Sequence, residues 1–212
     1  MHIAELELTA AAPHALAPFY AEVLGLPISL AGGALAVRVG ASLLRFVPGQ
    51  AGVYHFAMNV PRQRIADAVV WLAPRASLLA DSAGQTVFHT DSWDSDAVYF
   101  RDPVGNILEL IARHSLPDEP PDAADAPFGP QCLRCISEIG IACDDVPASI
   151  AAYCALLGAQ PYSESSASFA PIGDERGLLI LVKTGRVWFP ETGIPAARLP
   201  LTVRADGQTI VM

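Results

Sequence analysis

Apolar and polar residues alternate over short stretches of this chain, and helical patterns and glycine turns separate these stretches. At 4–9, alanine and leucine alternate with glutamate and threonine, which predicts a strand with one buried face. Helical spacing then runs from Pro13 to Gly25. Short strands are predicted at 34–39 and 42–47. The first unit, at about 1–49, is therefore a strand, a helix and further strands.

The same order begins again at about residue 50 and continues to 115. Alternation at 53–60 predicts a strand, and Pro61 opens a helical pattern. Three further strands are predicted at 86–89, 97–101 and 107–112. Residues 1–115 are therefore expected to form one domain of two related units.

A linker and a shorter third unit follow. Residues 116–131 contain five prolines and four acidic residues but almost no large apolar side chain, which predicts a linker. The third unit, at 132–212, is predicted to hold a strand from Ile136, a helix at 147–157, strands near 168–172 and 177–182, and a hairpin at Asp206-Gly207. Too few residues remain for a complete fourth unit.

The first and third units also share a spacing. Glu5 and Tyr20 are 15 residues apart (20 − 5), as are Glu138 and Tyr153 (153 − 138), and a Leu-Gly pair follows each tyrosine at the same distance. This internal repeat indicates copies of one module with the order strand, helix and three strands.

Composition and net charge indicate which kinds of molecule this protein binds. The 212 residues are 52% hydrophobic and 17% charged, which predicts a globular protein with a sizeable core. A net charge of −9 repels nucleic acid and anionic membranes, so a small molecule is the expected partner. No apolar run has membrane-spanning length and the acidic N-terminal stretch is unlike a signal peptide, so the cytoplasm is the expected location. All four cysteines lie between 132 and 154, which predicts reduced thiols.

One carboxylate interrupts an otherwise apolar strand. Glu109 lies among isoleucine and leucine at 107–111. An ionised carboxylate on a buried strand is costly unless a cation compensates it. The compensating group could be a metal ion, or it could be Arg45 or Arg101 in a structural ion pair.

Three stretches together resemble the vicinal oxygen chelate superfamily, which includes glyoxalases, bleomycin-resistance proteins and extradiol dioxygenases. They are the phrase at 19–26, the restart Tyr54-His55-Phe56, and the turn and strand at 99–110. The resemblance covers about 1–113 and continues more weakly through 136–182. It implies an α+β fold of repeated βαβββ modules, with two modules paired into a cup-shaped sheet and a third, incomplete module.

The resemblance also implies a metal site, because family ligands come from the first and last strands of each module. These positions fall on Glu5, His55 and Glu109, while the fourth falls on Arg45, which cannot bind a cation. In one outcome Glu5, His55 and Glu109 hold a divalent ion and Arg45 binds an anionic substrate group. In the other, Arg45 neutralises the carboxylates and the cup only binds ligand. Without the family register, Glu5 would suit a solvated strand face, and His55 a core position.

The implied activity is that of a metal-dependent lyase, isomerase or dioxygenase acting on a small molecule with adjacent oxygens. Glu5 or Glu109 would serve as proton shuttle, and Trp93 and Tyr99, with Arg45, would contact the substrate. One histidine and two carboxylates favour Mn, Zn, Ni or Mg over Fe. A metal-free binding protein of the bleomycin-resistance type is the alternative. Family precedent also implies a homodimer, and Glu138, without a ligand on its matching last strand, is expected to be part of a scaffold.

Overall fold

The computed structural model describes residues 1–117 and 126–212, so part of the predicted 116–131 linker lies outside the described residues. The strands of the first half are β1 (Ile3–Ala10), β2 (Ile28–Ala31), β3 (Ala34–Val39), β4 (Ser42–Pro48), β5 (His55–Val60), β6 (Val87–Thr90), β7 (Ser95–Arg101) and β8 (Ile107–Arg113). Those of the second half are β9 (Cys135–Cys143), β10 (Phe169–Asp174), β11 (Gly177–Lys183), β12 (Leu201–Ala205) and β13 (Gln208–Val211). The α-helices are α1 (Ile65–Leu72) and α2 (Val146–Leu157).

The helix predicted from Pro13 to Gly25 is not a continuous α-helix. It is a 3₁₀ turn at Pro13–Leu16 followed by a π-helical turn at Phe19–Val23. Pro18 lies between the two and has no backbone N–H to donate, so a regular α-helical ladder cannot run through it.

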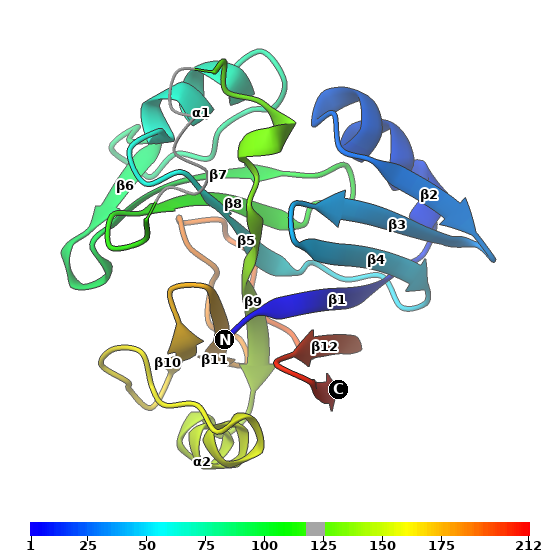
Figure 1. Ribbon diagram of the computed structural model, residues 1–212. Helices are drawn as coiled ribbons and strands as arrows, with labels where there is room; N and C mark the ends of the chain where they lie inside the picture. The colour runs from blue at the N-terminus through cyan, green and yellow to red at the C-terminus, as the bar shows by residue number, and fades with distance from the viewer. Residues whose placement is uncertain (118–125) are drawn as a thin grey trace.

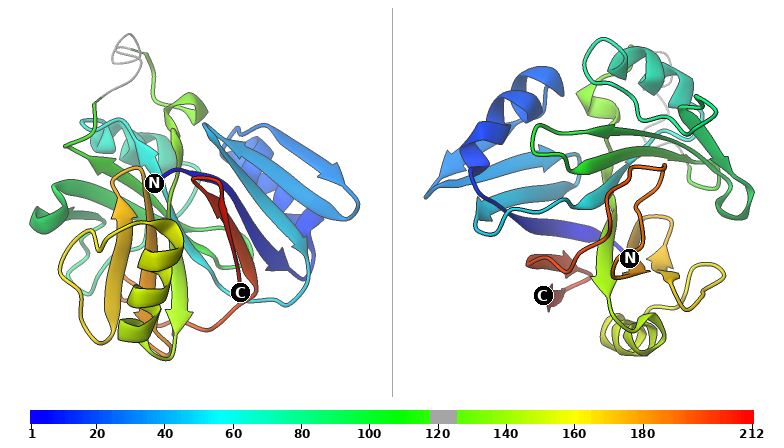
Figure 2. Two further views of the ribbon diagram at one scale, coloured as in Figure 1. Left: turned by 60° about the horizontal axis from the view of Figure 1, so that its bottom comes forward. Right: turned by 180° about the vertical axis from the view of Figure 1, so that it is seen from behind.

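The strands form two sheets (Figure 1). Sheet A has the order β13-β12-β1-β4-β3-β2, and sheet B has the order β10-β11-β9-β5-β8-β7-β6. The α+β class and the glyoxalase-like cup are confirmed, because sheet B curls into a half-barrel with α1 and α2 on its outer side (Figures 1 and 2).

The modules that share the cup differ from the expected pair. The second module supplies β5–β8, and its first strand pairs antiparallel with β9, the first strand of the third module. The first module lies in sheet A, where β1 pairs on one side with β4 and on the other with β12 of the C-terminal hairpin. The expectation that 1–49 and 50–115 pair with each other is therefore corrected. The modules are grouped by which strand edges pair, β5 with β9 and β1 with β12, and not by their order along the chain.

Because side chains alternate along β5, its two faces contribute to two different apolar clusters. Phe56 and Met58 belong to the large core behind the sheets, together with Leu6, Leu8 and Phe46. Ala57, on the other face, belongs to a smaller cluster that lines the cup with Tyr99 and Trp188. His55 shares a face with Ala57 because side chains two residues apart on a strand point the same way.

Asp102 organises the tight turn between β7 and β8. Its carboxylate accepts hydrogen bonds from the backbone of Val104 and Asn106 and from the Asn106 side chain, at 2.8–3.1 Å. The hydroxyl of Tyr20, from the first module, donates to the same carboxylate at 3.1 Å. This buried acid therefore fixes the turn that leads into the strand of Glu109 and ties it to the first module.

Candidate metal centre

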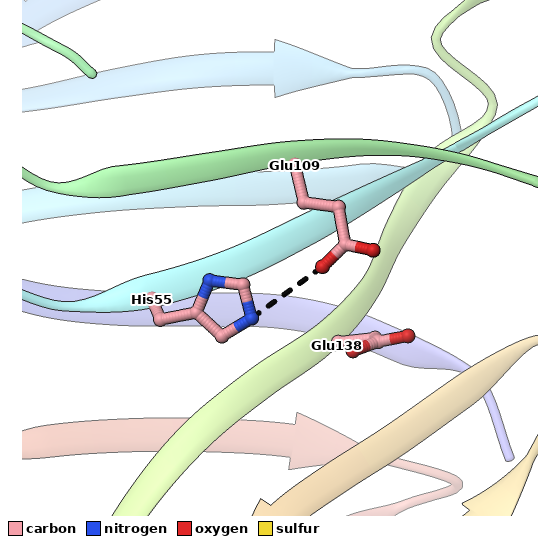
Figure 3. Close-up of side chains that lie close together, drawn as sticks. All are labelled: His55, Glu109 and Glu138. Atoms are coloured by element: carbon pink, nitrogen blue, oxygen red, sulfur yellow. Dashed lines mark ion pairs between the residues drawn. The ribbon is translucent and has the colours of Figure 1, made fainter. Parts of the chain in front are cut away.

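Three ligand-type side chains meet on three neighbouring strands of sheet B (Figure 3). Ala57 of β5 is opposite Glu109 on β8 and opposite Glu138 on β9, so the two carboxylates flank a small methyl side chain in one row. His55 is two residues away on the same face of β5. One ligand atom from each of His55, Glu109 and Glu138 lies within 4.8 Å of the others, and all three residues are buried. The register of the strands thus builds a compact triad.

A backbone hydrogen bond orients the imidazole of His55. Its Nδ1 lies 3.2 Å from the carbonyl oxygen of Ile107, an acceptor that requires a proton on Nδ1. Nε2 then carries the lone pair and lies 3.5 Å from Oε2 of Glu109. Burial lowers the pKa of His55 to about 4, against a weaker opposing effect of the Ile107 hydrogen bond. At neutral pH the ring is in the state that binds a metal ion.

The two carboxylates carry more charge than their surroundings neutralise. Burial raises the pKa of Glu109 well above its usual value, and the charge of Glu138 raises it further. Burial also raises the pKa of Glu138, against the lowering effect of Arg113. Tyr99 lies opposite Glu109 on β7, and its hydroxyl opposes the rise in the pKa of Glu109. With both acids ionised, Arg113 offsets one negative charge and the other needs a cation or a proton.

Arg113 forms a buried ion pair with Glu138. Nη2 of Arg113 donates to Oε1 of Glu138, and both side chains are buried. The guanidinium also stacks on the rings of Trp93 and Tyr162, at 5.3 and 5.7 Å from their centroids. Its Nε and Nη1 have no hydrogen-bond partner in the part of the chain that the structure describes. Arg113 therefore holds one oxygen of Glu138 and leaves the other available.

A cavity of about 550 Å³ opens over the triad. Arg186 and Glu191 contribute charged side chains to its lining. The aromatic part of the wall consists of Trp93, Tyr99, Phe169, Trp188 and Phe189. Such a volume with mixed apolar and polar walls suits a small organic molecule.

The segment 184–200, after β11, forms one side of this cavity. Figure 2 (right) shows it rising in orange to the underside of β7 and β8. The ring of Trp188 packs 5.3 Å from that of His55, and Phe189 packs on Tyr99. Arg101 of β7 donates to the carbonyl of Thr192 at 3.2 Å, which anchors the segment across the cup.

The predicted site residues separate into two groups. His55, Glu109, Trp93 and Tyr99 all line the cavity, but Glu5 and Arg45 lie on sheet A, away from the triad. Arg45 Nη1 lies 3.5 Å from Glu5 and 3.3 Å from Glu7, so these charges compensate each other on a partly exposed face. The expectation that Glu5 and Arg45 join His55 and Glu109 is corrected, because β1 and β4 are not strands of the cup.

Glu138 is the ligand-type residue that the sequence interpretation assigned to a scaffold. Its signal was present, since it repeats the first-strand position of the module. On β11, the position opposite Gly140 corresponds to that of Glu109 and is occupied by Ile180, so the cup offers three ligand positions of four. Arg113 and Trp188 gave no local signal, because their roles depend on contacts with distant parts of the chain.

Comparisons with known proteins agree with this architecture. No protein-family model matches the sequence, and no curated protein is significantly similar to it. Among solved structures, a proposed dioxygenase from Bacillus subtilis aligns with a TM-score of 0.61 and 16% identity, over 99% of this chain and 68% of that protein. A glyoxalase I variant from Zea mays aligns with a TM-score of 0.57 and 15% identity, over 88% and 68%. Both have the vicinal oxygen chelate fold, which confirms the predicted resemblance at the level of the fold.

Proposed function

We propose that this protein is a metal-dependent enzyme of the vicinal oxygen chelate type, a lyase, isomerase or dioxygenase that acts on a small molecule with two adjacent oxygens. The observation that carries the proposal is the buried His55–Glu109–Glu138 triad at the base of a cavity. A soluble, cytoplasmic homodimer remains a prediction. Within the described residues, no helix is long and apolar enough to cross a membrane.

The donor set fits a divalent ion. The lone pair on Nε2 of the neutral His55 ring faces a carboxylate oxygen of Glu109 at 3.5 Å. Two such acceptors repel each other unless a proton or a cation lies between them. The three ligand atoms lie within 4.8 Å of one another. This limit is slightly more than twice the ordinary metal–ligand distance of about 2.0–2.2 Å, so binding of one ion would draw the side chains a short way together. Two oxygens and one nitrogen favour Mn, Zn, Ni or Mg over Fe.

Each residue of the site would have a definite part. His55, Glu109 and Glu138 would hold the ion and leave other positions free for substrate, and Arg113 would keep Glu138 in place. When bound, the ion supplies Lewis-acid activation of the substrate oxygens. Glu109 is suited to accept and return a proton, because burial and the charge of Glu138 raise its pKa above the ordinary range of a carboxyl group.

A metal-free ligand-binding protein is the second candidate, and the Arg113–Glu138 pair favours it. If Glu109 keeps a proton, Arg113 and Glu138 cancel and the cup is neutral without an ion. The cavity would then bind a small molecule without turnover.

Metal analysis of the purified protein tests the proposal. We expect about one equivalent of divalent metal per chain in the wild type, and its loss in Glu109→Gln and Glu138→Gln, which each remove a ligand charge. Glu5→Gln is the matched control, because Glu5 lies on sheet A and the variant should retain the metal.

The outcomes separate the two candidates. A wild type that contains no metal and takes up none of Mn, Zn, Ni or Mg on titration would eliminate the enzyme proposal. Equal metal loss in Glu5→Gln and Glu138→Gln would show that the triad is not the site.

A further inference from the structure

A second cavity, of about 350 Å³, lies where strand ends of the two sheets meet. Asn59 to Arg62, at the end of β5, form one wall, and Ala41 approaches from the turn before β4. Arg134, directly before β9, and Arg176, in the turn between β10 and β11, complete it. It shares no lining residue with the cavity over the triad. Its volume lies within the range of small-molecule sites.

The wall of this cavity is basic in an acidic protein. The chain has 13 lysines and arginines against 22 acidic residues. Even so, the cavity is lined by His2, Arg62, Arg134 and Arg176, and no carboxylate is among its described lining residues. Such a local reversal of charge attracts anions against the overall field.

Two of these arginines have no counter-ion among the described residues. Within residues 1–117 and 126–212, the guanidinium groups of Arg134 and Arg176 make no hydrogen bond or ion pair, although both backbones are well anchored. The backbone N–H of Arg134 donates to the carbonyl of Asn59, and that of Arg176 to the Asp174 carboxylate, each at 2.8 Å. Burial raises the pKa of the nearby Cys135 thiol to about 11, so it supplies no negative charge.

We propose that this cavity binds a small molecule through a doubly charged phosphate group held by Arg134 and Arg176. Guanidinium forks bind phosphate oxygens in pairs, and one dianion neutralises two arginines at once. The apolar side chains of Val60, Pro61 and Leu116 in the same wall suit a short organic group attached to the phosphate. The proposal is independent of the metal centre.

Calorimetric titration with inorganic phosphate, sn-glycerol 3-phosphate and acetate tests this site. The protein is first stripped with a chelator, so that phosphate cannot bind through a metal ion. We expect saturable binding of both phosphates, with acetate at least about tenfold weaker because it carries one charge. Tighter binding of glycerol phosphate identifies an organic ester as the ligand, and equal binding identifies free phosphate.

Variants assign the binding to the two arginines. Arg134→Gln and Arg176→Gln should each weaken phosphate binding about tenfold, and together should abolish it. Arg38→Gln removes an exposed charge from β3 and should leave the affinity within about twofold of the wild type, which controls for net charge. Thermal melting of each variant establishes that it is folded.

Three results would overturn the proposal. The first is the absence of saturable phosphate binding up to roughly 10 mM, about ten times a Kd of ~1 mM. The second is equal affinity in Arg38→Gln and the double variant. The third is loss of phosphate binding when metal is removed. None of these changes the metal content that tests the proposed function, so the two proposals fail separately.

Discussion

Replacing Arg113 by methionine removes the cation that compensates Glu138 in the metal-free protein. Both partners are buried, and methionine keeps an unbranched, though shorter, side chain without the charge. Breaking such a pair by removing one partner costs about 3–5 kcal/mol. The guanidinium also loses its stacking on Trp93 and Tyr162, which adds to the cost. We therefore expect Arg113→Met to lower the free energy of unfolding by about 4 kcal/mol at pH 8.

The cost should depend on pH, and its sign follows from Glu138. Burial already holds the folded-state pKa of Glu138 above its ordinary value, and loss of Arg113 raises it further. The folded variant then binds a proton more tightly than the unfolded chain does. The loss of stability is therefore small below the unfolded pKa and grows as pH rises through the folded pKa.

Urea unfolding in chelator at pH 5 and pH 8 measures both effects. Arg45→Met is the matched control, because its pairs on sheet A are partly exposed and should contribute less than about 1 kcal/mol. Arg113→Met combined with Glu138→Met should recover most of the loss, since neither charge remains. The reasoning is refuted if Arg113→Met costs no more than Arg45→Met at pH 8, or if the double variant is less stable than the single one.

Two further predictions concern the same cavity. The lowered pKa of His55, about 4 against 6.5, gives stability that is present above pH 6.5 and is lost as pH falls towards 4. His55→Gln has no group that titrates in this range, so its stability should not show this loss. The difference in free energy of unfolding between the metal-free wild type and His55→Gln, measured in urea, should therefore shrink by roughly 3 kcal/mol between pH 7 and pH 4. A difference that stays the same at both pH values contradicts the prediction. In Gly140→Ala, the new Cβ would lie 2.4 Å from Cη2 of Trp188, so we expect a loss of about 1–3 kcal/mol and altered tryptophan fluorescence. Trp188→Phe replaces the indole by a smaller ring that lacks Cη2, and a loss of stability as large in that background would count against the clash.

Local patterns were sufficient to predict most elements of the fold. Alternation at 53–60 located β5 and placed His55 on it, and the apolar stretch at 107–112 located β8 and placed Glu109 on it. The same alternation accounts for Phe56 and Met58, which lie on the face opposite His55 and pack in the large core. These features depend on residues close in sequence, so period and turn chemistry determine them.

The grouping of the modules could not be predicted in the same way. The first strands of all three modules are apolar on one face and carry a ligand-type residue, namely Glu5, His55 and Glu138. Their local sequences do not indicate which strand edge of one module pairs with which strand edge of another. Glu5 was therefore assigned to the cup and Glu138 to a scaffold, whereas β5 pairs with β9 and Glu5 pairs with Arg45. Contacts between distant segments bring Glu138, and not Glu5, close to His55 and Glu109.

The pairing of β1 with β12 also constrains the order in which the chain can assemble. Every strand of sheet B has been synthesised once residue 183 has emerged, whereas β1 must wait for residues 201–205 before its outer edge is occupied. Closing the long loop between β1 and β12 is slow, because the chain loses conformational entropy before the contacts between the two strands can stabilise it. The half that holds the triad can thus fold early, while β1 keeps one edge exposed until residues 201–205 have left the ribosome.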